Sequence, residues 1–147
     1  MMLALIVALP FLAGALLLAV TNRARLLSAA IAFAFTAAAA VLLAVQIPDV
    51  ASGTVSSIGW DWLPLDGARL GFRLDGLAAM FAGMVLILGA LIILYARYYL
   101  SERDPIARFY AFFMLFMGSM LGVVLADNLI LLVVFWELTS LSSFLLI

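Results

Sequence analysis

The chain has 147 residues, of which 69% are hydrophobic and only 10% are charged, and its formal net charge is −1. Water-soluble domains of this length carry far more charge, so the composition predicts a protein that is embedded in the lipid bilayer. The sequence contains no cysteine and no histidine, which excludes disulfides, thiolate or imidazole metal centres and thiol redox chemistry. We therefore expect no metal and no cofactor, and the lack of a basic block predicts no nucleic-acid partner.

Five long apolar windows follow one another along the chain. Each is long enough to cross a hydrocarbon core about 30 Å thick, and backbone that faces lipid must satisfy its own hydrogen bonds. The first window lacks a positively charged start, so we interpret it as a retained helix and not as a signal peptide. The sequence predicts an all-α integral membrane protein with a single transmembrane domain over residues 1–147, with helices at about 2–20, 26–46, 76–97, 108–126 and 128–147.

The longest connection, residues 48–75, is rich in Gly, Ser, Asp and Pro. Two partly alternating segments in it, residues 58–63 and 69–74, flank an Asp-Gly pair at 66–67, which is a strong signal for a hairpin turn. We expect a small β-hairpin outside the membrane in this loop. Asp75 then has the position and the side chain of an N-cap for the third helix.

The arginines predict the orientation of the chain in the membrane. Five of them fall on one side of the predicted helices and two on the other, and basic residues are enriched in cytoplasmic loops. The more basic side is therefore expected to be cytoplasmic, with the hairpin loop external and the protein in the cell (plasma) membrane as a multi-pass chain. The five are Arg23, Arg25, Arg97, Arg103 and Arg108, and the two are Arg69 and Arg73.

Glu137 is the only charged residue in the last apolar window. A helix rises about 1.5 Å per residue, which places Glu137 roughly 13 Å from Asn128 and near the middle of the membrane. A carboxylate at that depth is costly and is usually kept for a partner, a water-filled path or proton transfer. Ser140 and Ser143 lie about 60° and about 120° around the helix from it, so the three side chains predict a polar sector that lines an ion path.

Structural roles are the alternatives for these residues. Glu137 would then only fix helix packing, and Ser in membrane helices more often joins helices than binds ligands. Asp127 and Asn128 either coordinate a cation at the mouth of a path or, more simply, cap the last helix. Gly118 and Gly122 form a GxxxG-type pattern, which predicts close helix packing.

Three stretches of the sequence carry a resemblance to a known family. They are Leu-Asp-Gly-Leu at 74–77, the glycine-containing segment 115–128, and Phe-Trp-Glu-Leu-Thr-Ser-Leu-Ser-Ser-Phe at 135–144. Together they closely resemble the large A-type subunit of the Mrp-type multisubunit monovalent cation/proton antiporters. The chain is also similar, more distantly, to the antiporter-like proton-pumping subunits of respiratory complex I. The resemblance covers essentially the whole chain, and the last stretch favours the A-type subunit over its relatives.

The resemblance implies a subunit of a secondary transporter, not an enzyme, which exchanges a monovalent cation, with Na⁺ as the first expectation, for protons. In this family a glutamate on the fifth helix pairs with a lysine on a later helix and switches proton transfer, and the glutamate corresponds to Glu137. This sequence has no lysine. Other antiporter membrane subunits, or a missing C-terminal part, are therefore expected to supply the lysine, and we expect a truncated or split version of a longer protein. Two alternatives stay open: a proton-translocating subunit of a complex I-like redox pump, and a purely structural membrane-assembly subunit.

Overall fold

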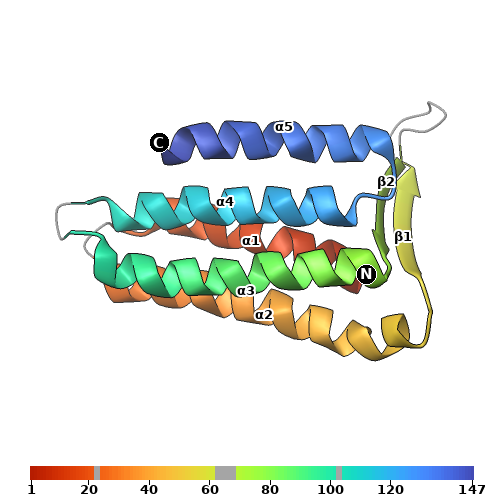
Figure 1. The fold of residues 1–147 in the computed structure, drawn as a ribbon. Coiled ribbons are helices and arrows are strands. Elements are labelled where there is room, and N and C mark those ends of the chain that lie inside the picture. The colour runs from red at the N-terminus through yellow and green to blue at the C-terminus, as the bar shows by residue number, and fades with distance from the viewer. Residues whose placement is uncertain (22–23, 62–68, 102–103) are drawn as a thin grey trace.

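The computed structural model of the chain describes residues 1–21, 24–61, 69–101 and 104–147. The helices of the described residues lie side by side and alternate in direction, and a two-stranded antiparallel sheet stands across one end of them (Figure 1). The predicted class, an all-α membrane protein with five long apolar helices and a small hairpin, is confirmed. The elements are α1 (Met2–Ala19), α2 (Arg25–Ala51), β1 (Ser56–Asp61), β2 (Arg69–Leu74), α3 (Gly76–Tyr99), α4 (Ile106–Leu125) and α5 (Leu129–Leu146).

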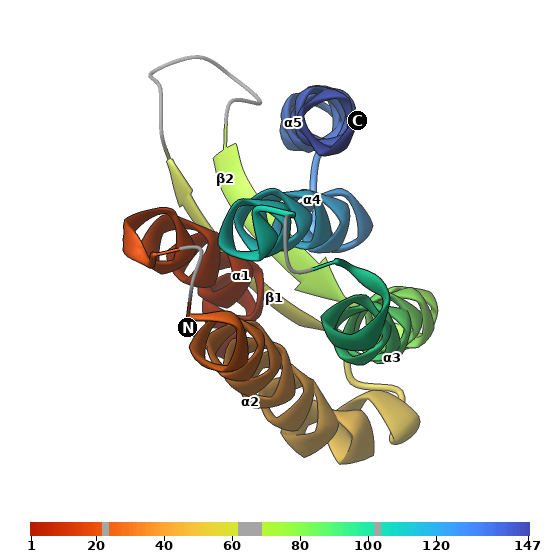
Figure 2. The ribbon, with the colours of Figure 1, turned by 90° about the vertical axis from the view of Figure 1, so that its left-hand side faces the viewer.

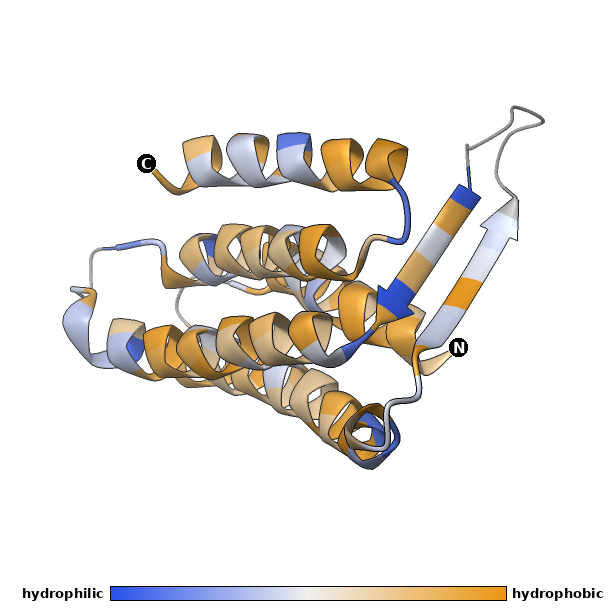
Figure 3. Ribbon diagram, turned by 45° about the vertical axis from the view of Figure 1, so that its right-hand side comes forward, coloured by the Kyte–Doolittle hydropathy of each residue, from blue (hydrophilic) through white to orange (hydrophobic). Residues whose placement is uncertain are grey.

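All five helices are long and apolar enough to cross a membrane. Strongly hydrophilic residues gather at the helix ends and on the strands, whereas the helix bodies are mostly apolar (Figure 3). The middle of α5 is the exception, because a hydrophilic segment follows its apolar first half.

Helix α4 lies at the centre of the bundle and α5 lies at its margin. Viewed along the helices, α4 is surrounded by α1, α3 and α5, whereas α5 stands beyond α4 (Figure 2). In the most apolar stretch of α4, 56% of the residues are buried within the protein, compared with 17% in α5. Most of the surface of α5 is therefore left uncovered by the described part of the chain.

The end of α2 differs from the prediction, which placed it at about residue 46, ahead of the connection at residues 48–75. The helix continues through Pro48 to Ala51. Pro48 removes only one backbone N–H donor, and hydrogen bonds from the residues after it satisfy the carbonyls of the last turn. Gly53 has a left-handed φ of 85°, and its N–H donates to Val50, while the N–H of Thr54 donates to the Asp49 carbonyl. This is a Schellman-type ending, and Gly53 is the sequence signal that marks it.

The close packing predicted around Gly118 and Gly122 is found, but aromatic rings fill the space instead of helix backbones. A Cβ atom on Gly118 would lie 2.9 Å from the ring of Phe11 in α1, and one on Gly122 would overlap the ring of Phe135 in α5. Direct backbone approach occurs at Gly14 of α1, where a Cβ would lie 3.0 Å from a carbonyl oxygen of α4. The two glycines of α4 therefore each leave room for one ring, Phe11 from α1 and Phe135 from α5.

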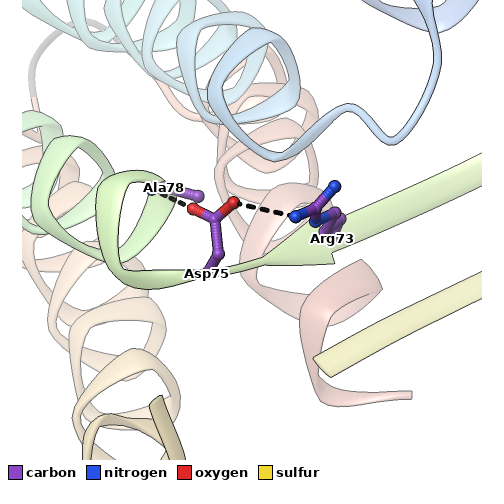
Figure 4. A network of polar contacts seen from close by, with 3 residues as sticks. All are labelled: Arg73, Asp75 and Ala78. Carbon is purple, nitrogen blue, oxygen red and sulfur yellow. Dashed lines mark hydrogen bonds and ion pairs between the residues drawn. The ribbon is translucent and has the colours of Figure 1, made fainter. Parts of the chain in front are cut away.

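The hairpin pairs in a single register, from Ser56 opposite Leu74 to Asp61 opposite Arg69. The predicted Asp-Gly turn at 66–67 lies outside the described residues. Directly after β2, Asp75 caps α3 as predicted, because its Oδ1 accepts a hydrogen bond of 2.9 Å from the N–H of Ala78 (Figure 4). Its Oδ2 lies 3.4 Å from a guanidinium nitrogen of Arg73, so one carboxylate joins the strand to the helix.

The free edge of β2 holds the turn between α4 and α5. The N–H of Asp127 donates to the Gly71 carbonyl at 2.9 Å, and the side-chain amide of Asn128 donates to the Arg69 carbonyl at 2.5 Å. The Asn128 side-chain oxygen accepts from the N–H of Leu131 at 2.9 Å, which is the N-cap predicted for this residue. Asn128 therefore caps α5 and tethers it to the hairpin at the same time.

We expect replacement of Asn128 to destabilise the chain in two separable steps. In Asn128→Ala both hydrogen bonds are lost, at a cost of about 1 kcal/mol for the cap and about 1 kcal/mol for the tether. In Asn128→Asp the carboxylate still accepts from Leu131 but cannot donate to Arg69, so only the tether is lost. Thermal unfolding in detergent should rank the stabilities as unmodified protein, Asp variant, Ala variant. An Asp variant as stable as the unmodified protein would contradict the tether, and equal losses in the two variants would contradict the cap.

Candidate functional site

Glu137 lies in the middle of α5, the ninth of its 18 residues. The helix begins at the Asn128 cap and runs through the apolar segment that follows, which gives an element about 27 Å long at 1.5 Å per residue. That length matches the hydrocarbon core of a bilayer, so a group at the centre of α5 is about as far from water as the membrane allows. The local sequence thus sets the depth of the carboxylate.

One stripe of α5 packs against the rest of the protein. It consists of Leu131, Phe135, Leu138 and Ser142, which recur at helical spacing on one face. Leu131 and Ser142 are buried, and the ring of Phe135 lies 6.3 Å from the ring of Phe11 in α1 and 6.1 Å from that of Phe72 in β2. This stripe fixes which face of α5 points toward α4.

The three predicted site residues lie off this stripe. Glu137, Ser140 and Ser143 are all exposed on the side of α5 that the described residues leave uncovered. The Ser140 hydroxyl reaches only the Trp136 carbonyl, at 3.5 Å. Within the described part of the chain, Glu137 forms no hydrogen bond or ion pair, and neither serine bonds to it. The helix therefore places the three side chains on one surface without joining them to each other.

The interior of the bundle offers no competing polar site among the described residues. Five buried Ser, Thr and Gln side chains are present among these residues, and each donates to the backbone carbonyl four residues earlier. The buried hydroxyl of Tyr110 in α4 donates to the Ile93 carbonyl of α3. Because these groups are already satisfied, they leave no chain of free donors and acceptors through the bundle. The five bonds are Ser28 to Ala24, Thr36 to Ala32, Gln46 to Leu42, Ser119 to Leu115 and Ser142 to Leu138.

Arg25 has a structural role that the sequence did not reveal. Its guanidinium donates to the carbonyls of Leu100 and Ser101, each at 2.7 Å, and so covers the end of α3. The last carbonyls of a helix have no partner within it, and the planar guanidinium suits two neighbouring acceptors. This contact is compatible with the predicted role of Arg25 in setting the orientation of the chain. No local sequence pattern, however, indicates a partner 75 residues away.

The sequence also did not indicate how α5 is seated. Phe135 fills the space that Gly122 leaves open, and Ser142 is the serine that faces α4. The spacing of Leu131, Phe135, Leu138 and Ser142 is a signal that could have found this face. In a helix that is apolar all around, however, several such stripes are possible, and only the neighbouring helix selects one.

The sequence of this chain is similar to a complex I family and to subunits of cation/proton antiporters. The family described as NADH-ubiquinone oxidoreductase (complex I), chain 5 N-terminus, matches residues 62–110. The probable A/B subunit of a K⁺/H⁺ antiporter of Rhizobium meliloti is 57% identical over 100 residues, covering 68% of this chain and 10% of that protein. The A1 subunit of a Na⁺/H⁺ antiporter of Staphylococcus haemolyticus is 51% identical over 87 residues, covering 59% of this chain and 11% of that protein.

The fold comparison extends over nearly the whole chain. In the structure of the Mrp complex from Dietzia sp. DQ12-45-1b, one chain is similar with a TM-score of 0.74 and 30% identity, over 99% of this chain and 16% of that chain. This chain thus spans a small part of the length of each relative. The five apolar helices and these relatives confirm the predicted multi-pass protein of the cell membrane. In sequence and in fold, the chain corresponds to an N-terminal segment of the large A-type subunit of the Mrp-type multisubunit antiporters, as its resemblance predicts.

Proposed function

We propose that the chain acts in a monovalent cation/proton antiporter, as a segment of one transporter subunit, and not as an enzyme. Glu137 takes up and releases protons, and Ser140 and Ser143 line the path beside it. The observation that carries this proposal is the position of Glu137: a carboxylate at the centre of a membrane-length helix, on a face that the described residues leave uncovered. An ionisable group at that depth is a functional candidate by default.

The same position requires a partner. A carboxylate that faced lipid alone would be costly, so the uncovered face of α5 is proposed to pack against another membrane segment that supplies a positive charge, such as a lysine. That segment belongs to another antiporter membrane subunit or to a further part of the same large subunit. The relatives are named for K⁺ and for Na⁺. We propose Na⁺ as the first cation to test, with K⁺ beside it.

Cation exchange in membrane vesicles tests the function. The chain is expressed with the other antiporter subunits, a pH gradient is established across the vesicles, and Na⁺ or K⁺ is added while a pH-sensitive dye is followed. Addition of at least one of the two cations should collapse the gradient, and vesicles without the chain should respond much less. A gradient that survives both cations would contradict the proposal.

A redox-linked proton pump is the second candidate, because the matching family is described by a complex I component. The two functions differ in their source of energy. Antiport needs only the cation and proton gradients, whereas a redox pump moves protons only when electrons flow. Exchange that proceeds without an electron donor supports the antiporter, and proton movement that requires a donor supports the pump.

The proposed orientation can be tested because the chain contains no cysteine. Ser57 in β1 and Ser101 between α3 and α4 are both exposed and belong to opposite ends of the bundle (Figure 1). In intact cells a membrane-impermeant maleimide should label Ser57→Cys, and it should label Ser101→Cys only after permeabilisation. The reverse pattern would overturn the orientation that the arginines predict.

A further inference from the structure

We infer that Phe135 and Gly122 form a positioning pair, which sets the direction in which α5 presents Glu137. This inference rests on the proposed function, since it assigns the pair a role through Glu137. Neither residue touches the carboxylate, and neither carries a group that could transfer a proton. Their contribution is geometric.

The Phe135 ring packs directly against the backbone of α4 at Gly122. Gly122 is buried in α4, and the Phe135 ring occupies the place where any other residue at position 122 would have its Cβ. The overlap involves the ring atoms Cγ and Cδ1, which lie close to the helix backbone. A change of rotamer therefore cannot easily move these atoms away while α5 stays in place.

Two further rings pack against the half-buried ring of Phe135. Phe11 of α1 and Phe72 of β2 both lie against it, with ring centroids 6.3 and 6.1 Å away. Three elements besides α5 thus meet at this one side chain. Because α5 has few other buried residues, the Phe135 contact is the main feature that opposes rotation of the helix near its middle.

Rotation of α5 changes the position of Glu137 directly. Residues two apart on a helix differ by about 200°, so Phe135 in its site places Glu137 on nearly the opposite face. A turn of about 60° would move a side chain on a helix of roughly 10–12 Å diameter by on the order of 5 Å. Proton transfer needs partners within hydrogen-bond distance, so a displacement of this size would break it.

The structure provides a matched pair of glycines for the test. Gly122→Ala places a methyl group against Phe135 of α5, whereas Gly118→Ala places the same group, one turn away in the same helix, against Phe11 of α1. Both variants overpack the bundle and are expected to lower its stability. Only Gly122→Ala is expected to turn α5. Phe135→Ala removes Cγ and every ring atom and should relieve the overlap when it is combined with Gly122→Ala.

The direction of α5 is measured by the distance between nitroxide labels in the purified complex. The labels are placed at Glu137→Cys and Ser57→Cys, in a chain that has no other cysteine. Gly122→Ala should shift this distance by up to about 5 Å, Gly118→Ala should leave it nearly unchanged, and adding Phe135→Ala to Gly122→Ala should reverse the shift. An unchanged distance in Gly122→Ala, or an equal shift in Gly118→Ala, would overturn the inference.

Exchange activity is measured on the same variants with Glu137 intact. Gly122→Ala should lower exchange by about tenfold or more, and Gly122→Ala with Phe135→Ala should recover most of it. The distance measurement does not depend on what Glu137 does. If Glu137 proves not to transfer protons, the labels still report whether the pair sets the direction of α5, so the two failures can be told apart.

Discussion

Replacement of Glu137 by glutamine is expected to abolish cation/proton exchange while the antiporter complex still assembles. Glutamine keeps the volume of the side chain and its capacity for hydrogen bonds, but it cannot bind and release a proton. Glu137 lies on the uncovered face of α5 and contacts no other described polar side chain, so the change should disturb little of the packing. Exchange in vesicles and a native gel of the solubilised complex measure the two effects separately.

The aspartate variant separates proton transfer from packing. Glu137→Asp keeps the titratable group and shortens the side chain by one methylene, so a proton carrier should retain partial activity. If Glu137 only fixed helix packing, the ranking of the two variants by exchange activity would reverse. The glutamine variant would keep nearly normal exchange, and the aspartate variant would lose more because its charge is misplaced. Near-normal exchange with glutamine would therefore end the proton-transfer proposal.

Asp49→Asn provides the matched control for this experiment. It makes the same change from acid to amide, but Asp49 lies in the last turn of α2, at the edge of the bundle, and not in the middle of a span. Its charge is near water, where the membrane imposes no large cost. Exchange should stay close to that of the unmodified protein. A loss as large as that of Glu137→Gln would show that the assay responds to any lost carboxylate.

The five helices could be predicted because the lipid solvent imposes a simple rule. Long apolar segments that cross the membrane must form helices, and the cap residues Asp75 and Asn128 mark where α3 and α5 begin. The predicted end of α2, at about residue 46, falls short of Ala51 because the predicted connection began at residue 48. A proline in the last turn of a helix removes only one backbone hydrogen bond. A glycine in the left-handed conformation, by contrast, ends the helix and satisfies its last carbonyls.

The site could be predicted only in part. Glu137 is conspicuous in the sequence because no other charge lies in its window, and the helical angle places Ser140 and Ser143 near it. The contact between Phe135 and Gly122, which we infer sets the direction of this sector, joins two helices and has no local signature in the sequence. Arg25 shows the same limit, since its partners at the end of α3 are brought to it only by the folding of the bundle.

The purified chain on its own, reconstituted in liposomes, is expected to show no cation/proton exchange. Only 17% of the most apolar stretch of α5 is buried, and Glu137 lies on its uncovered face. Without a neighbouring segment, Glu137 faces no group to which it could pass a proton. The buried hydroxyl and amide groups of the described parts of α2 to α4 are not expected to substitute, because each already donates to a backbone carbonyl.

The comparison that decides this prediction uses the same chain in two contexts. Liposomes that contain the complex with its other antiporter subunits should collapse a pH gradient on addition of Na⁺ or K⁺, and liposomes that contain an equal amount of the chain alone should behave like empty ones. The complex carrying Glu137→Gln provides the third arm, with assembly intact and the carboxylate removed. Exchange by the chain alone at a rate near that of the complex would refute the need for a partner beside α5. The path would then have to run through the described helices themselves.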